Sequence, residues 1–206
     1  MSRKAVAVLG VAVVLTFGGA ALALMNDASA EPGVAPAAQS DAPSQPAAPA
    51  LDDPTIVAIF DAANTADIET GRLAVERGAS KEVRDFGAML ARDHQAVRQQ
   101  GRDLAAKLKV TPTPPADDPS ARQHAAAMKH LRGLSGPEFD RAFLQHEVAF
   151  HKAVIDAVTT TLLPAIRNAE LKALVVKVAP AFEAHMLAAD NLATKLGLAT
   201  NETGSH

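Results

Sequence analysis

The feature that most limits how this chain can fold is the repeat of apolar side chains at spacings of three and four residues. In the first of four long segments with this repeat, the stripe consists of Ile56, Ile59, Phe60, Ala63, Ala66, Thr70, Leu73 and Ala74. Such spacing places these side chains on one face of an α-helix. No segment shows the sustained alternation with period two that indicates a half-buried strand. The sequence therefore predicts an all-α fold.

Start and stop signals divide the first half of the domain into two long helices. Asp53-Pro54 is expected to begin the first helix, with an acidic cap and a proline at the first helical position, and the helix is expected to end near Gly78. Ser80 is expected to cap the second helix, whose stripe is Val83, Phe86, Leu90, Val97, Leu104 and Leu108. Gly101 falls on the same stripe, where it would allow a neighbouring helix to approach closely.

The second half begins with a proline-rich loop over 111–119, followed by a short helix over 120–131. Ser135 and Glu138 are expected to form a capping box at the start of the third long helix, which Pro164 then ends or kinks. The fourth helix is expected over 165–196, where Pro180 either bends it or marks a junction, and Gly197 follows its end.

Four long amphipathic helices, of which only the second and third have a long connection, predict an antiparallel four-helix bundle. The short helix lies in that connection, and the bundle domain is expected over 53–199.

The N-terminus has the pattern of a secretory signal. Arg3 and Lys4 precede an apolar run over 5–25, and Ala28-Ser29-Ala30 matches a signal-peptidase site. We expect a signal peptide over 1–30, a disordered Ala/Pro-rich spacer over 31–52, and a disordered tail over 200–206. Cleavage predicts a periplasmic or secreted protein with no membrane span; the alternative is an uncleaved N-terminal anchor, because the apolar run is long enough to cross a bilayer.

Composition excludes several classes of function. The net charge of −3, with both signs interspersed, argues against a nucleic-acid partner, which requires a basic surface. The absence of cysteine excludes thiolate catalysis, a lipid anchor and cysteine metal sites, so any ion must be held by nitrogen and oxygen. Because no phosphate-binding glycine loop or G-x-S-x-G motif occurs, we predict no organic cofactor and assign no catalytic residue.

Polar residues on or beside the apolar stripes are the candidates for function. Asp93 is expected on the stripe of the second helix with His94 at its flank, and His146 on the stripe of the third. The other candidates are Glu147 and His151 at the edge of the third stripe, His185 on the fourth, and Asp67 and Glu69 at opposite edges of the first. Buried groups of this kind must be paired or metal-bound, since unpaired burial costs several kcal/mol. His124 and His130 are expected to be solvated.

Three stretches together carry a resemblance to a known family. They are Ala66-Asp67-Ile68-Glu69-Thr70-Gly71-Arg72-Leu73-Ala74, the segment from Val83-Arg84-Asp85-Phe86 to Asp93-His94, and Phe139-Asp140-Arg141-Ala142-Phe143 running to Glu147 and His151. With His185, they resemble the bacterial family called domain of unknown function 4142, over roughly 54–197. The resemblance implies an exported, ferritin-like helical bundle in the bacterial envelope, and it implies no activity.

The sequence therefore predicts a metal site inside the bundle, with His94, His151 and His185 as ligands. Glu147, Asp93 or Asp67 would serve as carboxylate ligands or as partners that orient the imidazoles. The Glu-x-x-His motif of di-iron bundles is missing, so a single divalent ion such as zinc, or iron, fits better than a di-iron centre. Two alternatives remain open: a metal-dependent oxidoreductase, and a structural or interaction module whose histidines are hydrogen-bonded internally.

Overall fold

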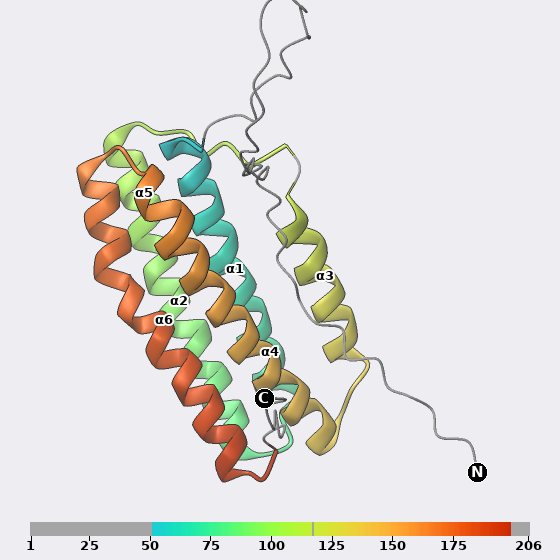
Figure 1. Ribbon diagram of the computed structural model, residues 1–206. Coiled ribbons are helices and arrows are strands. Elements are labelled where there is room, and N and C mark those ends of the chain that lie inside the picture. Colours follow the sequence, from blue (N-terminus) through green and yellow to red (C-terminus); the bar gives the residue numbers. More distant parts are fainter. Residues whose placement is uncertain (1–50, 117, 199–206) are drawn as a thin grey trace, which may run out of the picture. The chain divides into compact units, whose positions relative to one another are not determined.

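The computed structural model describes residues 51–116 and 118–198, and within these ranges every regular element is helical (Figure 1). The elements are α1 (Asp53–Arg77), α2 (Lys81–Leu108), α3 (Pro119–Arg132), α4 (Gly136–Ala157), a π-helical segment η1 (Val158–Leu162), α5 (Leu163–Ala165) and α6 (Ala169–Lys195). The prediction of an all-α fold is confirmed. The expected signal peptide, most of the spacer and the tail lie outside the described residues. Within those ranges no helix is long and apolar enough to cross a membrane.

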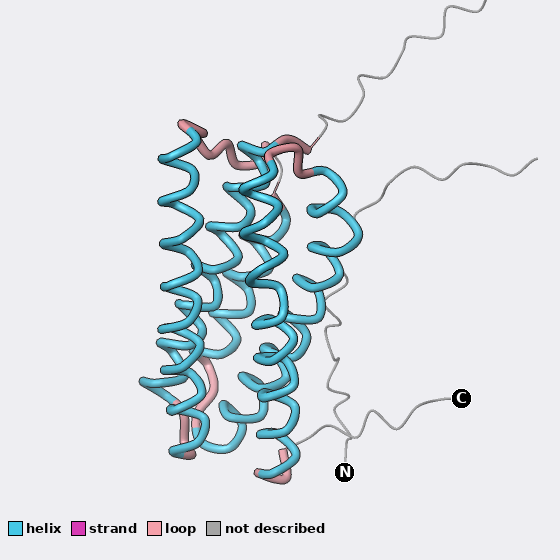
Figure 2. Tube along the Cα trace, turned by 90° about the vertical axis from the view of Figure 1, so that its left-hand side faces the viewer, coloured by secondary structure: helices cyan, strands magenta, loops and turns pink. Residues whose placement is uncertain are grey.

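The long helices form two hairpins that pack against each other. The turn 78–80 joins α1 to α2, and these two helices are in contact along their length; α4 and α6 form the second pair. Contacts of α2 with α6 and of α1 with α4 join the pairs, and the two views show all four helices running side by side (Figures 1 and 2). The shorter α3 lies outside them, against α1 and α4.

Two glycines allow α1 and α2 to come very close. A Cβ atom built on Gly87 would lie 2.6 Å from the backbone oxygen of Gly71, and one built on Gly71 would lie equally close to the oxygen of Gly87. Gly101 has the role that its position on the stripe predicted, because a Cβ there would lie 2.8 Å from Cε1 of Phe60. The hairpin therefore requires the absence of side chains at these positions.

The apolar core is divided into two clusters along the helices. One contains Leu73, Phe86, Leu90, Phe139 and Phe143, near the turn between α1 and α2. The other contains Ile56, Phe60, Leu162, Val175 and Phe182, near η1 and the start of α6. Between them, α1, α2, α4 and α6 each contribute buried polar side chains. The fold thus surrounds a polar layer with apolar side chains at both ends.

Each hairpin has its turn closed by an aspartate of the other hairpin. At one end, the carboxylate of Asp140 in α4 accepts hydrogen bonds from the backbone N–H groups of Ala79 and Ser80, both at 2.8 Å. At the other end, Asp53 in α1 accepts hydrogen bonds from the backbone N–H groups of Arg167 and Asn168, both at 2.9 Å. These four bonds tie the two hairpins together at both ends.

Three expectations about helix ends are wrong. The cap of α1 is Asp52, which accepts a hydrogen bond from the backbone N–H of Thr55 at 2.9 Å, so that Asp53 is the first helical residue and not the cap. Ser135 occupies the cap position of α4, but its side chain makes no capping hydrogen bond, so the capping box is absent. The helical path also continues through η1 and Pro164, and the last long helix begins only at Ala169. Its start is fixed by Asn168, whose side-chain oxygen accepts from two backbone N–H groups of the first turn. Pro180 lies within α6 and marks no junction.

Candidate metal centre

A central polar layer lies between the two apolar clusters. Its members are Asn64, Asp67 and Thr70 from α1, His94 from α2, Glu147 and His151 from α4, and His185 from α6, each with less than a tenth of its surface exposed. Glu147 and His151 are fully buried. Because buried polar groups are costly without partners, the partners of each one decide what this layer can do.

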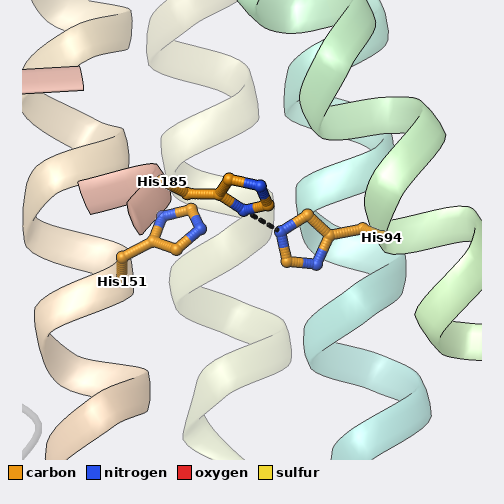
Figure 3. A group of neighbouring side chains, drawn as sticks. All are labelled: His94, His151 and His185. Atoms are coloured by element: carbon orange, nitrogen blue, oxygen red, sulfur yellow. Dashed lines mark hydrogen bonds between the residues drawn. The ribbon is translucent and has the colours of Figure 1, made fainter. Parts of the chain in front are cut away.

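Three imidazoles from three helices converge in this layer (Figure 3). One ring nitrogen each of His94, His151 and His185 lies within 4.8 Å of the others. The ring centroids are 5.1 Å apart for His94 and His185, and 5.5 Å apart for His151 and His185. The structure thus brings together the three histidines that the sequence singled out as ligands.

Asn64 fixes the orientation and tautomer of His94. The side-chain amide of Asn64 donates a hydrogen bond to the backbone oxygen of Phe60, at 2.8 Å. This leaves its oxygen 3.0 Å from Nδ1 of His94, so Nδ1 must carry the proton and donate it. The other ring nitrogen of His94, Nε2, therefore presents a lone pair toward the layer.

His151 is held in the same tautomer by the backbone. Its Nδ1 donates to the carbonyl oxygen of Glu147, at 2.9 Å, which leaves Nε2 without a proton. That Nε2 is buried and has no hydrogen-bond partner. A histidine that donates through one nitrogen and presents the other bare is prepared for metal ligation.

His185 stands between two acceptors. Its Nδ1 lies 3.1 Å from the bare Nε2 of His94, and its Nε2 lies 3.4 Å from a carboxylate oxygen of Asp93. Burial lowers the pKa of His185 although Asp93 raises it, so the neutral ring has one proton for two acceptors. A cation at Nδ1 would resolve this conflict, because the proton could then remain at Nε2 and be donated to Asp93.

The spacing of the two nitrogens suits a shared ion. If each lay about 2.05 Å from one metal ion, a separation of 3.1 Å would correspond to an angle of about 98° at that ion. This angle lies between the octahedral value of about 90° and the tetrahedral value of about 109°.

Two buried carboxylates lie beside His151. Asp67, Glu147 and His151 each have one ligand atom within 4.8 Å of the others. The two carboxyl groups are close enough to hydrogen-bond to each other when one of them carries a proton, and Oδ2 of Asp67 lies 3.4 Å from Nδ1 of His94. Burial raises the pKa of Asp67 well above its usual value, and the charge of Glu147 raises it further. Burial also raises the pKa of Glu147 to about 8. Without a cation, the two carboxyl groups are therefore held partly protonated.

The imidazoles have the opposite tendency. Burial, with the charges of the neighbouring histidines, lowers the pKa of His94 to about 3. Burial is also the main cause that lowers the pKa of His151 to about 4. Both rings are thus neutral at physiological pH, which is the form that binds a metal ion.

The predicted positions around the helices need correction. Asp93 was expected on the buried stripe and His94 at its flank, but the Asp93 side chain is 35% exposed and paired with Arg92, whereas His94 is buried. Likewise, His146 is half-buried, whereas Glu147 and His151 lie at the centre. In α2, the buried line runs at four-residue spacing through Phe86 and Leu90 to His94, and in α4 it runs from Phe143 through Glu147 to His151, so that Asp93 and His146 each fall one residue to the side.

Sequence reasoning also missed partners of the site. Asn64 lies four residues after Phe60 and therefore on the same helical face, which is the signal that could have identified it. His124, expected to be solvated, lies with its Nε2 2.8 Å from an oxygen of Glu69 and connects α3 to α1. Asp67 was placed correctly as a candidate, but its complete burial was not expected. His130 is exposed, as predicted.

Comparison with known proteins identifies a family without an activity. The family model described as "Domain of unknown function (DUF4142)" matches residues 37–192, which is most of the chain. No curated protein and no solved structure gives a significant match.

Proposed function

The chain belongs to the DUF4142 family, and we propose that it is a metal-binding protein which holds one divalent transition-metal ion in its central polar layer. The observation that carries this proposal is the lack of donors in the layer. Six buried side-chain nitrogen and oxygen atoms of the described residues have no hydrogen-bond partner, and all but His124 Nδ1 belong to Asp67, Glu147 or His151. Such atoms are costly when bare and are suitable ligands when an ion is present.

Charge balance supports a single ion. Three neutral imidazoles and two carboxylates carry a charge of −2, which one divalent cation neutralises. A second divalent ion would leave an uncompensated charge of +2 in a buried layer, where an unpaired charge is strongly destabilising. This argument, together with the missing Glu-x-x-His motif, favours a mononuclear site over a di-iron centre.

The ligand set that we propose has His151 at its centre. His151 belongs both to the group with His94 and His185 and to the group with Asp67 and Glu147. An ion at its bare Nε2 would have imidazoles on one side and Asp67, whose carboxylate oxygen lies 4.0 Å from that nitrogen, on the other, while Glu147 lies 3.5 Å from Nδ1. Asp93 would orient His185 from outside the coordination shell, and Asn64 would do the same for His94.

The wider architecture and location are part of the same proposal. We propose that the two hairpins form a ferritin-like, antiparallel four-helix bundle, supported by the contacts of α1 with α4 and of α2 with α6. We also propose export to the bacterial envelope through cleavage after Ala30, supported by the Ala28-Ser29-Ala30 pattern. Mass spectrometry of protein recovered from the producing cells tests the cleavage, because an uncleaved chain would retain residues 1–30.

The metal content of protein purified without a histidine tag tests the main claim. We expect about one divalent ion per chain in the wild type, and loss of that ion in His94→Ala and His151→Ala. His130→Ala is the matched control, because this exposed histidine lies on α3 and should leave the metal content unchanged. Circular dichroism on each variant separates loss of the ion from loss of the fold.

A wild type without metal would contradict the proposal. If the wild type contains no metal and its melting temperature does not change with zinc, iron, manganese or copper, the proposal is wrong. The polar layer would then be an internal hydrogen-bonded network that holds protonated carboxyl groups. If metal is bound equally by the wild type and by His151→Ala, the ion lies elsewhere.

A further inference from the structure

A small apolar cavity lies next to the polar layer and has no role in the proposed metal site. It has a volume of about 60 Å³ and is enclosed by α1, α4, η1 and α6. Its wall includes Ala63, Val158, Val178 and Phe182, and the wall area is almost entirely apolar. This volume has room for a molecule of one or two heavy atoms.

The cavity offers nothing that would hold water. Asn64 is its only polar lining residue, and both ends of that side-chain amide are already used, by the oxygen of Phe60 and by Nδ1 of His94. A buried water molecule typically requires two to four polar partners, and apolar cavities without them stay dry. The space is thus suited to an apolar occupant.

A second hollow lies beside the cavity at η1. This hollow of about 30 Å³ shares Val158, Ala179 and Phe182 with the wall of the first, and its other lining residues include the exposed Thr159 and Glu183. The π-helical turns of η1 widen the backbone here, and π-helical insertions often occur at functional sites. The hydroxyls of Thr159 and Thr160 donate to the backbone oxygens of Ile155 and Asp156, which stabilises this irregular segment.

The inner end of the cavity adjoins the imidazoles. Phe182 lines the cavity, and its ring centroid lies 5.4 Å from that of His94 and 6.1 Å from that of His151. One aromatic ring therefore lies between the apolar space and the two histidines. A molecule bound in the cavity would be in the immediate surroundings of an ion in the polar layer.

We propose that this cavity is a binding site for a small apolar molecule of the size of dioxygen, which enters between η1 and α6 at Thr159 and Glu183. The inference concerns binding alone and does not require that the polar layer hold a metal ion. It can therefore fail while the metal proposal stands, and the metal proposal can fail while this one stands.

Dissolved dioxygen gives the direct test, because it accelerates the relaxation of nearby protons. In the purified protein under oxygen pressure, the methyl groups of Val178 should relax faster than those of Val176, which lies two residues away and is 53% exposed. The measurement is made before and after chelator treatment, so that a bound paramagnetic ion does not contribute. Faster relaxation at Val176 than at Val178 would overturn the proposal, since exposure alone would then explain the contact with oxygen.

Xenon binding, compared between the wild type and variants whose cavity is filled by a larger side chain, provides the control. The wild type should show saturable xenon binding in 129Xe spectra, and Ala179→Leu should abolish it because the larger side chain occupies the shared wall. Ala173→Leu, at an exposed position of the same helix, should bind xenon like the wild type. If Ala179→Leu fails to fold, Ala63→Leu fills the cavity from α1. Saturable binding that persists in the folded, filled variant, or that is absent from the wild type, would refute the site.

Discussion

The replacement of Glu147 by glutamine tests the charge state of the polar layer in the metal-free protein. Burial raises the pKa of Glu147 to about 8, so the folded state retains a proton that the unfolded chain has already lost. Stability must then fall as the pH rises toward 8, because the unfolded state binds fewer protons than the folded state. Glutamine has no proton to lose and removes this dependence on pH.

The difference between the wild type and Glu147→Gln from pH 6.5 to pH 8 isolates this effect. Histidines act in the opposite direction at the lower end of this window, since unfolded imidazoles are half protonated at a pKa of about 6.5 while the buried ones stay neutral, but both proteins share that contribution. One proton over 1.5 pH units corresponds to about 2 kcal/mol of unfolding free energy. For a domain of this size, that is a difference of roughly 4–8 °C in the change of melting temperature between the two proteins.

Thermal melts of chelator-treated protein at the two pH values measure this difference. Between pH 6.5 and pH 8, we expect the melting temperature of the wild type to fall relative to that of Glu147→Gln, because only the wild type loses the Glu147 proton. Glu138→Gln is the matched control, because Glu138 is exposed on the same helix and should behave like the wild type. Saturating metal should remove the decrease in the wild type, since an ion stabilises the ionised carboxylates. Equal pH dependence in the wild type and in Glu147→Gln would refute the reasoning.

Three further predictions follow from contacts in and beside the layer. Asn64→Ala removes the nearer acceptor of Nδ1–H of His94 and leaves only Asp67, 3.4 Å away, so it should lower metal affinity by about 10- to 100-fold in competition titrations with a chelator. Gly87→Ala places a Cβ against the backbone oxygen of Gly71 and should destabilise the protein by about 1–3 kcal/mol in urea melts, whereas a loss below 0.5 kcal/mol would show that the helices separate freely. Below pH 6.5, stability of the metal-free protein should fall toward pH 4, and melts across that range measure it. The unfolded chain takes up protons at four histidines whose pKa is lowered in the folded state, which outweighs the opposite effect of the two carboxyl groups, Asp67 and Glu147, whose pKa is raised; the histidines are His94, His146, His151 and His185.

The helices and their number could be read from the sequence because they depend on local signals. Ser80 caps α2 as predicted, and α1 begins at Asp53-Pro54, although its cap is Asp52; the side-chain and backbone chemistry of these residues acts within a few residues. The junction after α4 was not predictable in the same way, since η1 has no characteristic residue pattern and Asn168 competes with Pro164 as the start of the last helix.

The candidate site could be predicted in its residue types, though only partly in its geometry. His185 was identified because it is a polar residue within an apolar stripe, and His94 and His151 because they lie beside one. Their convergence depends on the height of one hairpin relative to the other, which no local pattern encodes. The roles of Asp93 and His94 were exchanged for a related reason: adjacent residues differ by about 100° around the helix, and the contact sector of α2 is set by both α1 and α6.

The aspartates that close the hairpin turns also determine the height of the ligands. If one hairpin slid along the other by a helical turn, about 5.4 Å, His94 would leave the 4.8 Å range within which it meets His151 and His185. The same movement would break the bonds of Asp53 at one end and of Asp140 at the other. The two carboxylates thus act as stops against axial sliding in either direction. The alignment of the three imidazoles is consequently determined at the two ends of the bundled helices, by residues that lie outside the polar layer.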